Sequence, residues 1–184
     1  IVKSSITSDQ IRLFYRLLTC NVVVTSSFVS ILIDSPDSWS HASLILSLLK
    51  AALISDINDV FLQFLQKCSK EEKHIFQQIY KMEDFFKSMQ DLLESGNARA
   101  PLFLLYCIAP IEDAALLLAN HPLLFSLIEL KGSQIQRLQI FSSLCSHEAF
   151  CVNTKYIDGI IDILVTSMSI NSLLLPSVRL IASF

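Results

Sequence analysis

The chain has 184 residues, of which 52% are hydrophobic and 17% are charged, and 14 Lys and Arg against 17 Asp and Glu give a formal net charge of −3. This hydrophobicity excludes an intrinsically disordered chain, and the nearly balanced charge gives no support to a basic nucleic-acid-binding surface. Only 3 Gly residues are present, which disfavours sandwiches, barrels and doubly wound sheets because their tight turns require Gly.

Apolar residues recur with helical spacing along nearly the whole chain, which predicts an all-α fold. In the N-terminal part, this spacing predicts helices over residues 28–33, 39–55, 60–67 and 70–81. Candidate N-caps precede several helical stretches. These are Ser8-Asp9, Asp37-Ser38 and Ser133.

The C-terminal half repeats one plan. Helices are expected over 85–94, 123–130 and 158–167, and each is followed by a break and then by a longer apolar helix. The breaks are expected at Gly96, Gly132 and Asn171, with further breaks at Pro110 and Asp158-Gly159.

Comparing the sequence with itself supports a repeat, because a shift of 36 residues superimposes apolar positions and one glycine on another. The shift places Leu124, Phe125, Leu127 and Ile128 on Ile160, Ile161, Ile163 and Leu164, and it places Gly96 on Gly132. We therefore expect one continuous array over 1–184, with its clearest repeats at 82–120, 121–157 and 158–184. Phe125 and Ile161 should then occupy equivalent places in neighbouring layers of stacked helices.

Two segments, 121–146 and 158–184, resemble the second and third helices of an armadillo repeat. Residues 159–165, Gly-Ile-Ile-Asp-Ile-Leu-Val, are similar to that family's Gly-x-hydrophobic-x-x-Leu-Val opening. Residues 138–145, Leu-Gln-Ile-Phe-Ser-Ser-Leu-Cys, are similar to its Ala-Leu-x-x-Leu-Ser-Asn-Leu-Ala close. The resemblance implies a right-handed superhelix of stacked repeats, an α-solenoid. HEAT repeats share most of these motifs, so both families stay open.

In armadillo proteins the long third helix lines a concave groove that binds partner proteins. The resemblance implies a groove face made of Ala100, Phe103, Cys107, Gln136, Gln139, Ser143, Leu173, Pro176 and Leu180. Nuclear-import receptors use Trp and Asn on this face to clamp a basic peptide, but this face has neither residue. The expected ligand is instead a helix or an extended segment of another protein. Alternatively, the apolar groove residues pack against neighbouring chain.

Catalytic and metal-binding motifs are not evident. Cys145, His147 and Cys151 supply three irregularly spaced ligands, whereas structural zinc sites need four. We expect Cys145 in the core, His147 facing solvent, and His121 at the start of a helix. No metal, cofactor, catalytic residue or small-molecule substrate is expected. Five scattered cysteines favour thiols in a reducing, cytoplasmic compartment over a disulfide framework.

The longest uncharged stretches, 17–33 and 163–178, are short and contain several polar residues, so no membrane span is expected, although a bundle of short membrane helices is an alternative. Mixed charges over 67–87 predict a solvated helical face or a contact patch. Both ends are expected to continue into a longer protein. The preferred function is a non-catalytic protein-interaction scaffold. The alternatives are a trafficking or nuclear-transport adaptor, and the helical regulatory region of an enzyme whose catalytic domain lies elsewhere.

Overall fold

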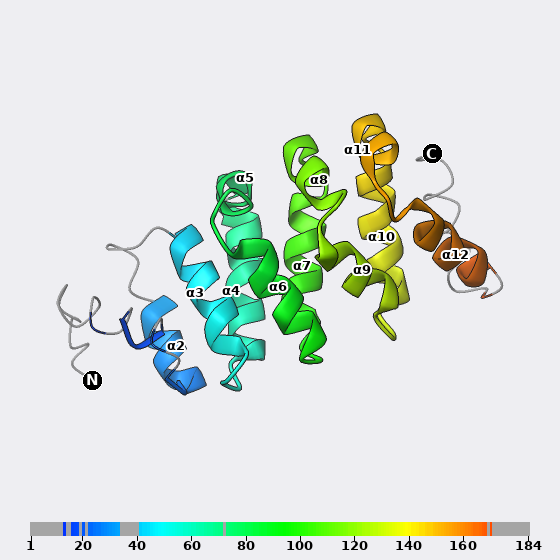
Figure 1. Cartoon of the computed structure of the whole chain (residues 1–184). Helices are drawn as coiled ribbons and strands as arrows, with labels where there is room; N and C mark the ends of the chain where they lie inside the picture. The colour runs from blue at the N-terminus through cyan, green and yellow to red at the C-terminus, as the bar shows by residue number, and fades with distance from the viewer. Residues whose placement is uncertain are drawn as a thin grey trace. The chain divides into compact units, whose positions relative to one another are not determined.

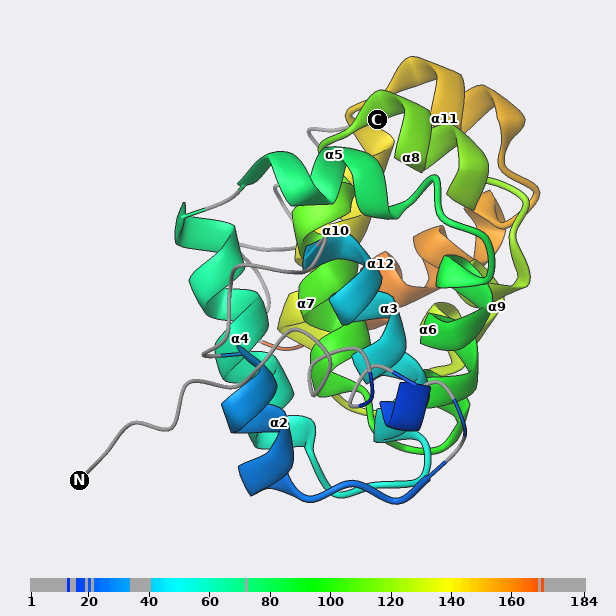
Figure 2. The same cartoon turned by 90° about the vertical axis from the view of Figure 1, so that its left-hand side faces the viewer.

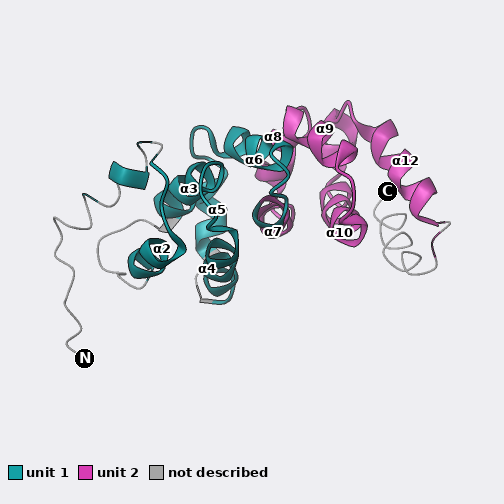
Figure 3. Cartoon of the chain, turned by 90° about the horizontal axis from the view of Figure 1, so that it is seen from below, with its two compact units in different colours: residues 1–100 teal, residues 101–184 magenta. Residues whose placement is uncertain are grey.

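The computed structural model describes residues 13, 16–18, 20, 22–33, 41–71, 73–168 and 170. Every regular element within these residues is a helix, which confirms the predicted all-α class. The chain divides into two compact units, residues 1–100 and 101–184, shown in different colours in Figure 3.

The first unit is built around a central helix. Its elements in chain order are α2 (Ser26–Ile33), α3 (His41–Ala52), α4 (Asn58–Glu71), the 3₁₀ helix η2 (Lys73–Ile75), α5 (Phe76–Ile79) and α6 (Phe85–Glu94), labelled in Figure 1. Helix α3 packs against α4, α5 and α6, and α2 packs against α4, as Figure 2 shows. The core side chains Ile45, Leu48, Phe61 and Phe85 are fully buried, so α3 contributes apolar surface to several neighbours at once.

Helix α6 ends at one of the predicted breaks, where a glycine forms its C-terminal cap. Gly96 has a φ of +89°, in the left-handed region where a residue without Cβ is not strained. Its N–H donates to the carbonyl of Leu93 at 3.0 Å, and the N–H of Asn97 donates to the carbonyl of Leu92 at 3.1 Å. These two bonds form a Schellman motif, so the helix ends at the break that the sequence predicted, and the structure supplies the chemistry of that end.

The expected single helix over 70–81 is wrong. Helix α4 runs to Glu71, and the chain then forms η2 and the short α5 before turning at Tyr80. Ile75, Phe76 and Ile79 are buried, and α5 contacts α3. Packing of these apolar residues against α3 therefore overrides the helical periodicity of the local sequence.

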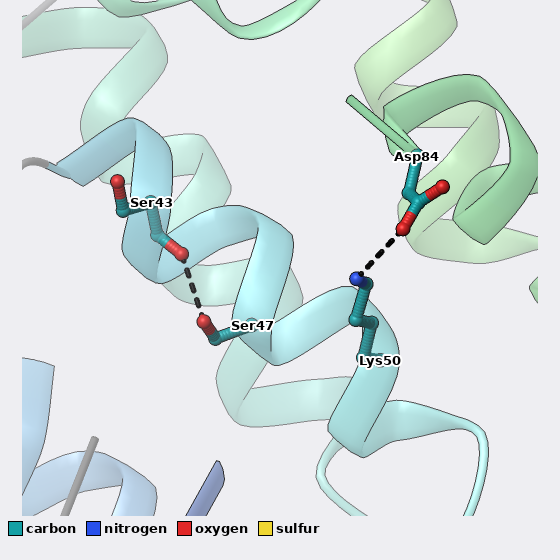
Figure 4. A network of polar contacts seen from close by, with 4 residues as sticks. All are labelled: Ser43, Ser47, Lys50 and Asp84. Atoms are coloured by element: carbon teal, nitrogen blue, oxygen red, sulfur yellow. Dashed lines mark hydrogen bonds and ion pairs between the residues drawn. The ribbon is translucent and has the colours of Figure 1, made fainter. Parts of the chain in front are cut away.

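A salt bridge joins α3 to the start of α6. Lys50 Nζ lies 3.2 Å from Asp84 Oδ2, as Figure 4 shows together with the bond from the Ser47 hydroxyl to the Ser43 carbonyl on α3. Asp84 precedes α6 with a φ of +63° and makes no side-chain cap bond. Both charged side chains are about half exposed, so the pair contributes little to stability.

The second unit continues from α7 (Arg99–Ile108), whose first two residues belong to the first unit. Its further elements are α8 (Glu112–Leu118), α9 (Pro122–Glu129), α10 (Gln134–Cys145), α11 (Glu148–Asn153) and α12 (Ile157–Met168). Helix α11 packs against α8 and α10, and α12 packs against α9 and α10 (Figure 1). Phe141 of α10 is fully buried, as its place in the apolar pattern predicted.

The sequence analysis located the longer helices but missed two short ones. Predicted 85–94 coincides with α6, 123–130 lies within one residue of α9, and 158–167 within one residue of α12. Helices α8 and α11 were not predicted. An acidic first turn, Glu112-Asp113 in α8 and Glu148 in α11, is the signal that could have found them.

From α6 onward, helix starts recur at a spacing of 35 to 37 residues. Helix α9 begins 37 residues after α6, α12 begins 35 after α9, α10 begins 35 after α7, and α11 begins 36 after α8. The long-range side-chain hydrogen bonds within each unit span nearly the same distance in sequence, 30 to 40 residues. They join Val24 to Ser55, Ser26 to Asp56, Lys50 to Asp84, Asn58 to Asn97, Asp59 to Arg99, Ala109 to His147, Ala119 to Thr154 and Asn120 to Asn153.

Candidate functional site

Two features of the second unit are candidate sites, and the first is the solvent face of α7 and α10. Helices α7 and α10 lie next to each other on one side of this unit in Figures 1 and 3. Phe103, Cys107 and Ser143 are half-buried, whereas Gln136 and Gln139 are exposed. All five predicted groove residues in this unit therefore lie on the part of their helix that reaches solvent.

The remaining predicted groove residues do not add to this face. Ala100 is only 2% exposed and belongs to the first unit, so it offers almost no surface to a partner. Leu173, Pro176 and Leu180 lie outside the described residues.

Sequence analysis missed the most exposed side chain on this part of α7. Tyr106 is 54% exposed and follows Phe103 by three positions, so the two share a helix face. Ile135 on α10 is also exposed. The helical spacing from Phe103 could have identified Tyr106, whereas the resemblance to armadillo repeats implied Cys107.

The second feature is an open pocket of about 260 Å³ between α9, α10 and α12. It is lined by Ile128, Glu129, Gln134, Arg137, Gly159, Asp162, Ile163, Thr166 and Ser167. Arg137 and Ser167 are buried, whereas Glu129, Asp162 and Thr166 are exposed. This pocket could not be predicted from the sequence, because its lining residues come from three separate helices.

Gly159 shapes one wall of the pocket, and its role corrects an expectation. It is not a break but lies inside α12, in ordinary helical conformation. A Cβ atom at this position would lie 3.1 Å from Cδ1 and 3.2 Å from Cγ2 of Ile128. The absence of a Cβ here therefore leaves room for the Ile128 side chain between α9 and α12, and does not serve a turn.

Arg137 is the only buried charged residue in the described part of the chain, with 7% of its surface exposed. Its Nη1 donates to the carbonyl of Ile128 at 2.9 Å, which satisfies one of the free carbonyls in the last turn of α9. Nε is buried and has no hydrogen-bond partner among the described residues. Burial lowers the pKa of Arg137, but a guanidinium stays charged in proteins. No described carboxylate, Glu129 and Asp162 included, forms an ion pair with it.

The thiols near α10 are poor nucleophiles. Burial raises the pKa of Cys107 to about 11. Burial, together with the neighbouring Cys151, raises the pKa of Cys145 well above its usual range, and the Cys151 thiol donates to the Cys145 carbonyl at 3.4 Å. Since the thiolate is the reactive form, both Cys107 and Cys145 are unreactive at neutral pH. Cys145 is buried as expected.

The two histidines have structural partners. His147 does not face solvent as expected, because its half-buried ring bonds through Nε2 to the carbonyl of Ala109 at 3.0 Å. His121 lies at the start of α9 as predicted, and its Nδ1 accepts the N–H of Leu123 at 3.1 Å. Within the described ranges, no group of three or more His, Cys, Asp or Glu side chains could hold a metal ion.

Comparisons with known proteins give no significant match to a family model, a curated protein or a solved structure. The resemblance to armadillo and HEAT repeats therefore rests on the sequence motifs alone. Among the helices formed by described residues, none has both the length and the apolar character needed to cross a membrane.

Proposed function

We propose that the chain is a segment of a non-catalytic scaffold in which armadillo-like or HEAT-like helical repeats stack in a right-handed superhelix and bind other proteins. The observation that carries this proposal is the agreement between two spacings. From α6 onward helix starts recur every 35 to 37 residues, and the long-range side-chain hydrogen bonds join residues 30 to 40 apart. Bonds of that span are expected when each repeat contacts only the next one along the chain.

The proposed binding surface is the solvent face of α7 and α10, defined by Phe103, Tyr106, Cys107, Gln136 and Gln139. It combines half-buried and exposed aromatic groups with amide groups that can donate and accept hydrogen bonds. Tyr is enriched at protein interfaces because one end of its side chain is apolar and the other polar. We propose that a helix or an extended segment of a partner docks on this face.

Small-angle X-ray scattering of the 184-residue chain tests the architecture. A row of stacked repeats gives an extended particle, whose radius of gyration exceeds that of a globule of the same length, about 16 Å. A radius of gyration at the globular value would contradict the superhelix.

Photo-crosslinking tests the binding face. A photoreactive amino acid is introduced at Tyr106 or Gln139, and at the exposed Lys155 as a control in the same unit. We expect both α7–α10 positions, but not the control, to crosslink the same protein in an extract. That protein, once purified, should bind the wild-type chain and bind the Q136E/Q139E variant at least about tenfold more weakly, while K155E binds normally. Equal binding by all three chains would contradict the proposed face.

A further inference from the structure

Helices α8 and α11 lie side by side in the second unit (Figure 2). Their beginnings are joined, because Nε2 of His147, the N-cap of α11, bonds to the carbonyl of Ala109, just before α8, at 3.0 Å. Their ends are joined by two further hydrogen bonds, Thr154 to Ala119 and Asn120 to Asn153. The two helices therefore run in the same direction, and residues at the same distance from the two helix starts are neighbours.

The solvent faces of both helices carry a carboxylate that is followed four positions later by an apolar side chain. All six side chains are exposed, and the pairs are Glu112 with Leu116, Asp113 with Leu117, and Glu148 with Val152. Positions four apart share a helix face and lie about 6 Å apart along the axis. The three carboxylates therefore form one stripe across both helices, and the three apolar side chains form a second stripe beside it. We call the two stripes together the α8–α11 surface.

The apolar stripe is not needed for packing within the chain. Val152 is 76% exposed, the highest value for a large apolar side chain among the described residues, and Leu117 is 54% exposed. The core-facing positions of the two helices are occupied by other side chains, among them Ala115, Leu118 and Phe150, which are fully buried. Single exposed apolar residues are common in folded proteins, but three on two adjacent short helices form a patch that a partner can cover.

Charge determines what kind of partner fits this surface. Residues 100–130 and 138–154 contain no Lys or Arg, so neither helix supplies a positive charge to balance the carboxylates. Lys155 follows α11, beyond the apolar stripe, and its Nζ lies 5.0 Å from the ring centroid of Tyr156. The α8–α11 surface is therefore both apolar and negatively charged, which favours a cationic partner and disfavours an anionic membrane.

The carboxylates alone would indicate no partner, because an acidic first turn also stabilises its own helix. Glu112 and Glu148 form no ion pair with any described residue, so both stay available to a cation. The neighbouring apolar stripe is the second observation, since a helix dipole gives no reason for exposed Leu and Val side chains.

We infer that the α8–α11 surface binds an amphipathic helix of a partner protein, whose apolar residues contact Leu116, Leu117 and Val152 and whose Lys or Arg residues face the carboxylates. An amphipathic helix presents an apolar stripe beside a charged one, so the two patterns match. The inference goes beyond the proposed function, because it assigns a surface other than the solvent face of α7 and α10 and states the charge of the ligand.

A designed peptide tests the inference without knowledge of the natural partner. The probe is a fluorescently labelled amphipathic helix of Leu and Lys, about 18 residues long because shorter helices are marginal in water. One control has Glu in place of Lys, and the other has the same composition in scrambled order. Fluorescence anisotropy with the 184-residue chain should show saturable binding of the probe and at least about tenfold weaker binding of either control. No saturable binding, or equal binding of a control, would overturn the inference.

Matched charge variants locate the bound peptide. E112Q/E148Q removes two carboxylates from the α8–α11 surface, and E129Q/D162N removes two exposed carboxylates elsewhere in the same unit. We expect the probe to bind E112Q/E148Q at least about fivefold more weakly than the wild-type chain, and to bind E129Q/D162N normally. Equal weakening by both variants would show attraction to negative charge in general, and the inference would be wrong.

Matched apolar variants test the second stripe. L117Q/V152Q makes this stripe polar, whereas V165Q/M168Q changes two exposed apolar residues of α12. All four side chains are exposed, so both variants should fold as the wild-type chain does, which circular dichroism verifies. We expect only L117Q/V152Q to weaken binding of the probe, again at least about fivefold. Unchanged binding by L117Q/V152Q would overturn the inference.

Two other occupants of the α8–α11 surface are outcomes that contradict the inference. Vesicles of neutral phosphatidylcholine test whether the apolar stripe binds a membrane, and analytical ultracentrifugation tests whether the surface pairs with a second copy of the chain. Vesicle binding or self-association that L117Q/V152Q abolishes would show such an occupant. None of these measurements uses Tyr106 or Gln139, so their failure leaves the proposed α7–α10 face standing, and a failed crosslinking experiment leaves the α8–α11 surface standing.

Discussion

The hydroxyl of Thr154 donates a buried hydrogen bond of 2.8 Å to the main-chain carbonyl of Ala119, 35 residues earlier in the chain. Ala119 is the C-cap of α8, where carbonyls have no partner within the helix. Thr154 follows α11, so the bond ties the end of one short helix to the end of the other. Its span of 35 residues is close to the distance of 36 residues between the starts of α8 and α11, so it links these two helices within the second unit.

Replacing Thr154 by Val should destabilise the protein by about 1–3 kcal/mol, because the buried carbonyl of Ala119 loses its donor while the side chain keeps its shape. Thr166→Val is the matched control, since the Thr166 hydroxyl bonds to a carbonyl of its own helix and is exposed to solvent. Chemical denaturation of both variants gives the two free energies of unfolding. Equal losses of free energy of unfolding would show that the buried bond between Thr154 and Ala119 stabilises the protein no more than the exposed bond of Thr166.

Truncating Phe141 to Ala should lower the free energy of unfolding by about 3–5 kcal/mol, because it leaves a cavity in the core of the second unit. Phe141 is fully buried, whereas Phe125, in the same unit, is 55% exposed and has its ring centroid 6.4 Å from that of Tyr156. Phe125→Ala should therefore cost much less. Thermal or denaturant unfolding compares the two variants, and a neutral Phe141→Ala would contradict the assigned core.

Stability should fall in acid partly through His121. Burial lowers its pKa below the ordinary 6.5. The neutral ring also accepts the N–H of Leu123 at the start of α9. The unfolded chain therefore binds a proton more readily than the folded one. The contribution of His121 is complete above about pH 6.5 and is lost as the pH falls through the lower folded pKa.

His121→Asn tests this pH dependence, since Asn caps helices well and does not titrate. Denaturation at about pH 7.5 and about pH 5.5 should show a smaller loss of stability in the variant than in the wild-type chain. The same loss in both chains would mean that His121 does not contribute. His121→Ala, which removes the cap altogether, should cost about 1 kcal/mol at the higher pH.

Gly132 and Ser133, which precede α10, should respond to substitution with opposite signs. Both have left-handed backbone conformations, with φ of +82° and +50°. A Cβ at Gly132 meets nothing within 4 Å, so Gly132→Ala should cost about 1 kcal/mol through backbone strain alone. Ser133 makes no side-chain cap bond, so Ser133→Gly removes strain without losing a contact and should be neutral or stabilising. Destabilisation by both changes would contradict this account.

Sequence patterns predicted elements whose causes are local. The apolar stripe of α6 and the glycine after it identified a helix and its C-cap, because both signals lie within a few residues of each other. The helix expected over 70–81 failed because packing of Ile75 and Phe76 in the core decides the path of the chain there. Gly159 shows the same limit, because the side chain that a Cβ at this position would approach belongs to Ile128, 31 residues earlier in the chain.

The two candidate sites also differ in how far the sequence could predict them. Exposure of Gln136 and Gln139 follows from their place on one helix, so the sequence could indicate them. The unpaired Nε of Arg137 was not foreseen, because it depends on how α9 and α12 cover α10.

The amino-acid sequence by itself determined that this protein is helical, where its longer helices lie and that their pattern recurs. These properties follow from hydrophobic periodicity and from the conformational preferences of single residues. Only the tertiary structure decided which carbonyl the hydroxyl of Thr154 reaches and which one the buried guanidinium of Arg137 reaches. Both depend on distances between residues that are far apart in the chain, and such distances are fixed only when the helices pack.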